Sequence, residues 1–122
     1  MAIPDFQTLM LPLLNHAGDG SEHAFRDAVE VLADSFRLTP EDRQQLLPSG
    51  RAPLFYNRLA WAKQHLVMAG LVDAPRRGVF RITPQGRQIL ARCPERIDLK
   101  LLQQIPQYQQ ARRGSASEPD AT

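Results

Sequence analysis

The sequence has 122 residues, of which 43% are hydrophobic and 23% charged, the composition of one ordinary globular domain. Its one cysteine, Cys93, excludes an internal disulfide and a multi-cysteine zinc site. No apolar run approaches the roughly 18 residues that cross a bilayer, and the N-terminus lacks the basic region of a signal peptide. We therefore expect a cytoplasmic protein with no membrane partner.

The net charge of +2 hides an uneven distribution along the chain. Residues 1–50 carry three arginines and eight acids, a net of −5, whereas residues 51–92 carry eight cations and one acid, a net of +7. A GC-rich genome would explain why thirteen of the fifteen cations are arginine, but not why they cluster. The basic block predicts a positively charged face for a polyanion such as nucleic acid.

Three helices are expected in the acidic first part of the chain. Residues 4–16 repeat apolar side chains at helical spacing, with a kink at Pro12. Residues 21–36 keep the same period after a glycine-containing turn, with Ser21 as the N-cap. A short third helix begins at Thr39, which is followed by a proline and two acids, the usual residues of a first helical turn.

The basic part of the chain predicts a longer helix, a hairpin and a further capped helix. Residues 53–69 place their largest apolar residues on one face and polar residues on the opposite face, which we expect to point outward. Residues 71–82 contain two short β-type runs around Pro75-Arg76-Arg77-Gly78, a hairpin turn with two cations at its tip. Thr83 and Pro84 then begin a helix that ends near Arg92.

The remaining chain has little to bury. Residues 95–108 are expected to form one short helix or linker that ends at Pro106, and residues 109–122 a disordered tail. Residues 1–94 would then form the folded domain. Its element order predicts a mainly α fold with a small β-hairpin, a winged helix-turn-helix, in which the helix at 53–69 enters the major groove and the hairpin lies along the backbone.

The candidate DNA-binding residues lie on the helix at 53–69, just before it and on the hairpin. Two arginines at an exposed turn suit phosphate contacts, and asparagine and arginine suit adenine and guanine edges. Amides before the helix could hold a phosphate. The competing interpretation is a solvated face with arginines paired to acids of the second helix. The predicted DNA-binding residues are Ser49, Gly50, Arg51, Asn57, Arg58, Lys63, Gln64, Arg76, Arg77 and Arg81.

No catalytic or metal site is predicted. The three histidines, His16, His23 and His65, lie on different elements without a helical pairing that would bring two of them together. Ser49 lacks a neighbouring base, and Cys93 lacks a partner that would activate it. We expect neither a cofactor nor a small-molecule substrate for this chain.

Several stretches are typical of one family. They are residues 3–12 (IPDFQTLMLP), 46–51 (LLPSGR), 55–63 (FYNRLAWAK), 66–72 (LVMAGLV) and 77–86 (RGVFRITPQG). Over residues 3–105 the sequence resembles the N-terminal domain of Mrr-type restriction proteins. The leucine-rich LLPSG stretch together with NRxxWA is the specific part, since the last two stretches occur in many winged helices.

The resemblance implies a DNA-binding module of a restriction endonuclease that acts on methylated foreign DNA. In the family this module precedes a PD-(D/E)xK nuclease domain that uses Mg²⁺. That nuclease half is missing from the sequence, so the resemblance implies a fragment or a stand-alone relative, and no cleavage by this chain alone.

Two other functions use the same fold. A stand-alone transcriptional regulator would use residues 1–16 or 95–108 to form a homodimer, because such proteins read half-sites in pairs. A winged helix used only for protein contacts would instead keep its arginines buried or paired. Double-stranded DNA remains the partner that the charge distribution favours, while the recognised base and its methylation are not readable from residue order.

Overall fold

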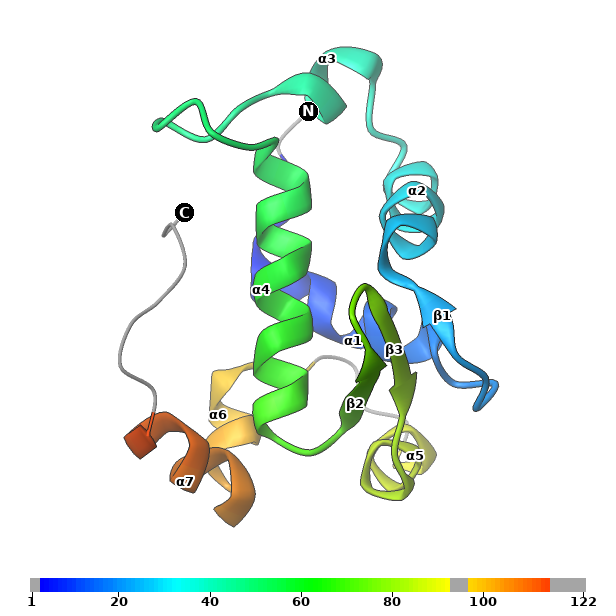
Figure 1. The fold of residues 1–122 in the computed structure, drawn as a ribbon, viewed down its shortest axis with the longest axis vertical. Helices are drawn as coiled ribbons and strands as arrows, with labels where there is room; N and C mark the ends of the chain where they lie inside the picture. The colour runs from blue at the N-terminus through cyan, green and yellow to red at the C-terminus, as the bar shows by residue number, and fades with distance from the viewer. Residues whose placement is uncertain (1–2, 93–96, 115–122) are drawn as a thin grey trace.

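The computed structural model describes residues 3–92 and 97–114 as helices arranged around a small sheet (Figure 1). The elements in chain order are α1 (Phe6–His16), β1 (His23–Ala24), α2 (Phe25–Ser35), α3 (Pro40–Gln44), α4 (Leu54–Met68), β2 (Val72–Arg76), β3 (Val79–Ile82), α5 (Pro84–Ala91), α6 (Leu99–Gln103) and α7 (Pro106–Gly114).

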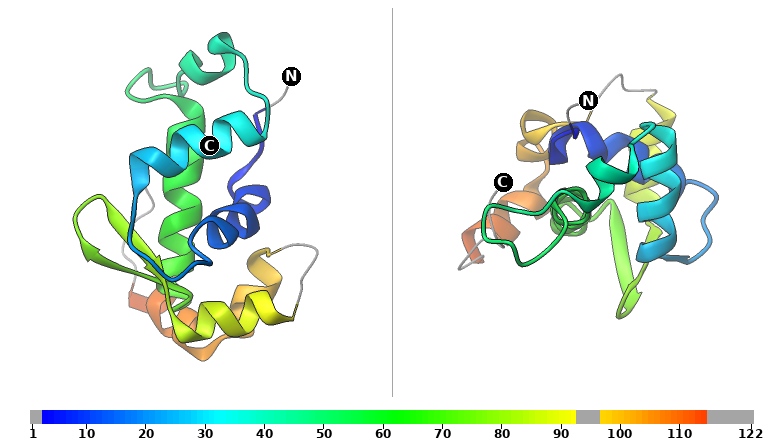
Figure 2. Two further views of the ribbon diagram at one scale, coloured as in Figure 1. Left: turned by 90° about the vertical axis from the view of Figure 1, so that its right-hand side faces the viewer. Right: turned by 90° about the horizontal axis from the view of Figure 1, so that it is seen from above.

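The sheet has three antiparallel strands in the order β1-β3-β2. His23 of β1 lies opposite Phe80, and Val72 of β2 lies opposite Ile82. A mainly helical chain with a small antiparallel sheet, whose hairpin β2–β3 follows α4, is the arrangement of a winged helix. The predicted fold class is therefore confirmed. The hairpin β2–β3 is the wing, and it projects beside the middle of α4 (Figures 1 and 2).

Helix α4 is the centre of the molecule because it is buried on two faces. The predicted apolar stripe faces the core, where α1 crosses it. Removing this much apolar surface from water is the main stabilising contribution to the fold. The stripe residues, all at most 2% exposed, are Phe55, Leu59, Ala62, Leu66 and Ala69.

The opposite face of α4 is also covered, which corrects the prediction that it points outward. Trp61 and His65 are 7% and 5% exposed, and their rings stack with centroids 5.2 Å apart. Phe6 stacks on the other side of His65 at 4.9 Å, and the Tyr108 hydroxyl of α7 lies 3.0 Å from His65 Nδ1. Residues distant in the sequence therefore close this face.

Helix starts follow their capping residues where the backbone is free to do so. Thr39 and Asp42 form the reciprocal capping box of α3, and Thr83 accepts from the Gly86 amide at the start of α5. Helix α2 begins at Phe25 and not near Ser21, because residues 23–24 pair with β3 instead. The Ser21 amide and hydroxyl are bonded to Asp19.

The C-terminal segment differs from the prediction. The predicted short helix ahead of Pro106 forms as α6, but Pro106 also occupies the first turn of a second helix, α7, where its missing N–H costs nothing, and residues 109–114 are helical. Ile97, Leu102 and Tyr108 are buried in the same core as the rest of the chain, so this segment is not a separate linker. Cys93 and the predicted tail beyond residue 114 lie outside the described residues.

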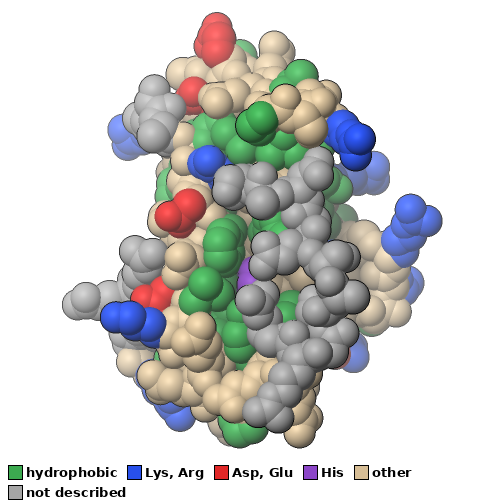
Figure 3. Space-filling view, turned by 90° about the vertical axis from the view of Figure 1, so that its left-hand side faces the viewer, with side chains coloured by type: hydrophobic (Ala, Val, Ile, Leu, Met, Phe, Trp, Pro, Cys, Tyr) green, Lys and Arg blue, Asp and Glu red, His purple; other side chains and the backbone are tan. Residues whose placement is uncertain are grey.

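Figure 3 views the molecule from the side of α7 and of the loop before α4. Hydrophobic side chains gather along the middle of this face, and the charged side chains lie mostly toward its edges. Across the described ranges, the model has no helix with the length and apolar content that a membrane span requires.

Candidate nucleic-acid interface

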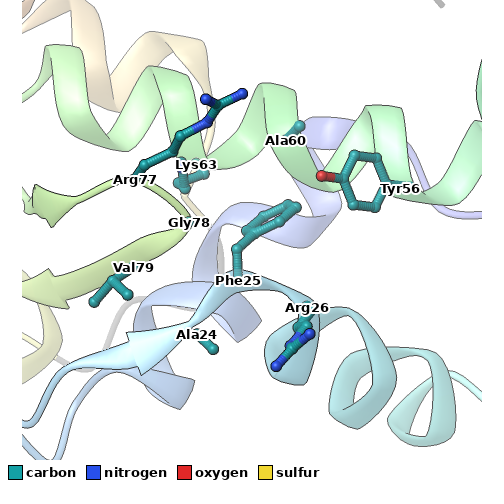
Figure 4. A pocket seen from close by; sticks show the side chains of 9 residues that line it. All are labelled: Ala24, Phe25, Arg26, Tyr56, Ala60, Lys63, Arg77, Gly78 and Val79. Atoms are coloured by element: carbon teal, nitrogen blue, oxygen red, sulfur yellow. The ribbon is translucent and has the colours of Figure 1, made fainter.

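A hollow of about 530 Å³ lies between the start of α2, the outer face of α4 and the turn of the wing (Figure 4). It combines aromatic and cationic side chains, and none of its nine lining residues is acidic. The lining consists of Ala24, Phe25, Arg26, Tyr56, Ala60, Lys63, Arg77, Gly78 and Val79. We refer to it as the basic hollow.

Backbone geometry brings the wing against the start of α2. Gly78 has φ +75°, which the tight turn between β2 and β3 requires and which other residues rarely adopt. Its carbonyl accepts a 2.8 Å hydrogen bond from the Phe25 amide, so the first residue of α2 is fixed to the tip of the wing. This bond also satisfies an amide that the helix itself leaves unpaired.

Phe25 forms the aromatic floor of the basic hollow. It is 6% exposed, and its ring meets the ring of Tyr56 edge to face with centroids 5.3 Å apart. The Lys63 ammonium lies 5.1 Å from the centre of the Phe25 ring, a cation–π contact. Partial burial lowers the pKa of Lys63 below its ordinary value of 10.5 because the charged form loses hydration.

Three cations from three different elements surround this floor. They are Arg26 of α2, Lys63 of α4 and Arg77 at the wing turn. Within residues 3–92 and 97–114, none of the three forms an ion pair with a carboxylate. The hollow thus combines an exposed aromatic ring with positive charges that no carboxylate neutralises. Such a surface suits a nucleic acid, which is anionic and carries aromatic bases.

The structure brings only some of the predicted residues to this place. Lys63 and Arg77 line the basic hollow, and Gln64 is exposed beside Lys63 on α4. Ser49, Gly50 and Arg51 are exposed in the loop before α4, which projects to the opposite side of α4 from the wing (Figures 1 and 2). The prediction that these residues form one contiguous surface with the wing is therefore wrong.

The loop before α4 does not offer the free amides that were predicted to hold a phosphate. The Gly50 amide donates to the Leu47 carbonyl at 2.8 Å, and the Arg51 amide donates to the Ser49 hydroxyl at 3.4 Å. The Arg51 side chain remains exposed, without an ion pair to any residue that the structure describes.

Asn57 and Arg58 are half-buried, and part of each polar group is turned into the protein, so the structure does not support base contacts by them. The Arg58 guanidinium donates to the carbonyls of Ile3 at 2.7 Å and Pro4 at 3.4 Å. Its Nε and the Asn57 Oδ1 are both buried. The alternative of an Arg58 ion pair with the second helix is also wrong, because the N-terminal segment holds this side chain.

Two wing arginines are exposed but already paired. Arg76 contacts Glu22, which precedes β1, at 2.6 Å, and Arg81 contacts Asp73 of the neighbouring strand at 3.0 Å. Both arginines are substantially exposed, at 68% and 46%, so these pairs are worth little energy and a phosphate can compete for them. Arg77 is therefore the arginine at the wing turn that can bind a phosphate without first breaking an ion pair with a described carboxylate.

Comparison with known proteins identifies the family of the chain that carries this surface. The family model of the Mrr N-terminal domain matches residues 6–92. The chain belongs to this family. It is also 31% identical over 96 residues to the type IV methyl-directed restriction enzyme EcoKMrr of Escherichia coli strain K12. That match includes 78% of this chain but only 31% of the relative's length. No solved structure matches significantly.

The Mrr N-terminal match includes the whole basic hollow, whereas α6 and α7 lie beyond its last residue, 92. These two helices pack on the side of α4 away from the wing, and Leu102 and Tyr108 join the core (Figure 1).

Among the lining residues of the basic hollow that sequence reasoning missed are Phe25, Arg26, Tyr56 and Ala60. A usable signal exists for two of them, since Tyr56, Ala60 and Lys63 recur at i, i+4 and i+7 and therefore share one helix face. Phe25 and Arg26 carry no such signal, because their position depends on where α2 begins.

The described residues contain no group of three or more histidine, cysteine or acidic side chains placed to hold a metal ion. His16 and His23 do meet, with ring centroids 4.6 Å apart, and His23 contacts Asp19 at 2.8 Å. Hydrogen bonds from His23 and Ser21 lower the pKa of Asp19 to about 2. This cluster joins α1 to β1 and lies outside the basic hollow.

Proposed function

We propose that this chain binds duplex DNA through the basic hollow and serves as the targeting module of a methyl-directed restriction system. The observation that carries the proposal is the set of three cations, Arg26, Lys63 and Arg77, around a hollow without an acidic lining residue. Membership of the Mrr N-terminal family and the name of the Escherichia coli relative support the link to restriction of methylated DNA.

In this proposal α4 lies along the major groove and the wing lies over the adjacent backbone. The outer face of α4 carries Tyr56, Ala60 and Lys63 toward base edges, and a groove about 12 Å wide admits a helix. Arg77 and Arg26 then neutralise phosphates on either side of the groove. Most of the binding energy comes from these phosphate contacts and is salt-dependent.

The regulator hypothesis receives no comparable support. It needs a helix free to pair with a second copy, yet Leu9, Met10, Leu13 and Leu14 of α1 are fully buried in the chain's own core. Leu102 and Tyr108 of the C-terminal segment are buried there as well. The apolar faces that the regulator hypothesis would use for a dimer are therefore already occupied within the chain.

Fluorescence anisotropy with a labelled duplex at several salt concentrations tests the proposal. Wild-type protein should bind at low salt, with log Kd rising linearly with log salt. Arg77→Ala and Arg26→Ala should each weaken binding to every duplex sequence and reduce the salt slope by roughly 1, one lost phosphate contact.

The matched control is Arg92→Ala, since Arg92 is exposed but lines the groove between α5 and the C-terminal helices instead of the basic hollow. It should keep the wild-type affinity and slope. Wild-type protein that binds no duplex at low salt would show the proposal to be wrong, as would an Arg92→Ala variant that loses as much affinity as Arg77→Ala.

A further inference from the structure

We propose that Tyr56, together with Ala60, reads methyl groups on base edges in the major groove. This inference rests on the proposed function, because it assigns a task within the same surface. The cations of the basic hollow supply affinity for any duplex, whereas the apolar strip on the outer face of α4 supplies the preference for a methylated one.

The exposure of Tyr56 is the first observation. Three large hydrophobic side chains are exposed among the described residues: Val31 at 48%, Leu46 at 52% and Tyr56 at 44%. Of these, only Tyr56 lines the basic hollow. An exposed aromatic side chain that lines the same hollow as three cations resembles the aromatic anchors found at the centres of binding surfaces.

The second observation is that the Tyr56 ring is held in place. It packs edge to face on Phe25, which is nearly buried and whose backbone amide donates a hydrogen bond to the Gly78 carbonyl. Figure 4 shows the two rings close together, with Ala60 one turn further along α4. Because alanine is short, the surface beside the Tyr56 ring is apolar and open, with room for a small group.

The chemistry of the major groove identifies that group. Apolar surface is presented there by methyl groups: the C5-methyl of thymine or of 5-methylcytosine, and the N6-methyl of a modified adenine. The Tyr56 hydroxyl can hydrogen-bond a phosphate or a polar base edge, but the apolar face of its ring beside the Ala60 methyl gains only from an apolar group. A methyl group on a base edge is therefore the ligand that fits this strip, and the surrounding cations place it next to DNA.

The test uses duplexes of one sequence that differ in a single methyl group. One duplex is unmodified, one carries 5-methylcytosine and one carries N6-methyladenine. Wild-type protein should prefer a methylated duplex by about fourfold per methyl contacted, the effect of removing one methyl-sized group from water. The two modified duplexes decide which base supplies the methyl group.

Tyr56→Ala should bring the methylation preference, measured as the ratio of the Kd for the unmodified duplex to the Kd for the methylated one, close to one. Tyr56→Phe should retain the preference, since it keeps the ring and removes only the hydroxyl. Arg77→Ala should weaken all three duplexes equally and leave the preference unchanged. Circular dichroism melting of each variant verifies that it is folded.

A preference that survives in Tyr56→Ala would overturn the inference, and so would a folded wild-type protein that binds all three duplexes equally. Either result leaves duplex binding itself intact. Failure of wild-type protein to bind any duplex at low salt is a separate outcome that overturns the proposed function together with the inference. Loss of preference in Tyr56→Phe would assign the discrimination to the hydroxyl and contradict reading by the ring.

Discussion

The half-buried guanidinium of Arg58 connects two parts of the protein. It donates to two consecutive carbonyls, those of Ile3 and Pro4, and thereby ties the segment before α1 to the first turns of α4. Hydrogen bonds from a charged donor contribute more than neutral ones, and the carbonyls would be left unsatisfied without it. The side chain is therefore a structural contact between positions 55 residues apart.

Replacing Arg58 by alanine should lower the free energy of unfolding by about 2 kcal/mol, because two hydrogen bonds to a charged group are lost. Urea denaturation measures this change. Arg51→Ala, which removes an exposed arginine, should change stability by less than about 0.5 kcal/mol. An Arg58→Ala protein that is as stable as wild type but binds DNA more weakly would show instead that Arg58 belongs to the DNA-binding surface.

Helical periodicity places a residue around its helix but does not say what packs on that face. Lys63 and Arg77 were predicted as binding residues, and the structure brings both to the basic hollow. Arg58 was predicted for the same reason, but the N-terminal segment holds its side chain. Nothing local in the sequence distinguishes these cases, because the covering residues lie more than fifty positions away.

Helix α5 approaches the sheet closely at Gly86. A Cβ at this position would collide with the Leu71 carbonyl oxygen and press on the Ile82 side chain. The Gly86 amide also donates to the Thr83 hydroxyl that caps the helix. The pattern of threonine, two residues and glycine thus combines a helix start with a contact that tolerates no side chain.

Gly86→Ala should destabilise the protein by about 2 kcal/mol or more, because the added methyl group meets backbone that cannot move without disturbing the sheet. Gln85→Ala, at the exposed neighbouring position of the same helix, should have little effect. Thermal unfolding of the two variants in parallel provides the comparison. Equal melting temperatures for both would contradict the close approach.

The junction between α1 and β1 should make stability depend on pH. Burial and the nearby His23 lower the pKa of His16 below its ordinary value of 6.5, against weaker opposite effects of Asp19 and Asp27. The unfolded chain therefore binds this proton more readily than the folded protein. The free energy of unfolding should fall as the pH drops below about 6.5 and level off below the folded pKa.

Denaturation curves between pH 4.5 and 8 measure this dependence. His16→Phe keeps an aromatic ring beside His23 and Phe80 but cannot take up a proton, so its stability should change less over the same pH window. An unchanged pH dependence in this variant would show that other groups cause it.

Elements with strong local signals were predictable, and those that depend on tertiary pairing were not. The capped starts of α3 and α5 and the buried stripe of α4 follow from residues close together in the chain. Strand β1 has two residues and exists because β3 pairs with it, which also delays the start of α2 to Phe25. Helix α7 depends in the same way on the packing of Tyr108 against His65.

At the scale of the whole molecule, the acidic first part of the sequence and the basic second part are only partly separated in space. Acids of α2 find a partner within the first half, since Arg43 contacts both Glu30 and Asp34. Arg76 pairs instead with an acid of that half, Glu22. The basic block therefore does not form one continuous surface, and its unneutralised part around the wing turn is smaller than the count of arginines implies.

The wing is joined to the first part of the chain by the Phe25–Gly78 hydrogen bond and by the pairing of β1 with β3. The wing thus holds its shape before DNA binds, and binding of a duplex does not have to order a mobile loop. Under the proposed function, little conformational entropy is lost by the protein upon association. The encounter rate would then be governed by long-range electrostatic steering, so it should be fast in dilute buffer and slow markedly as ions are added.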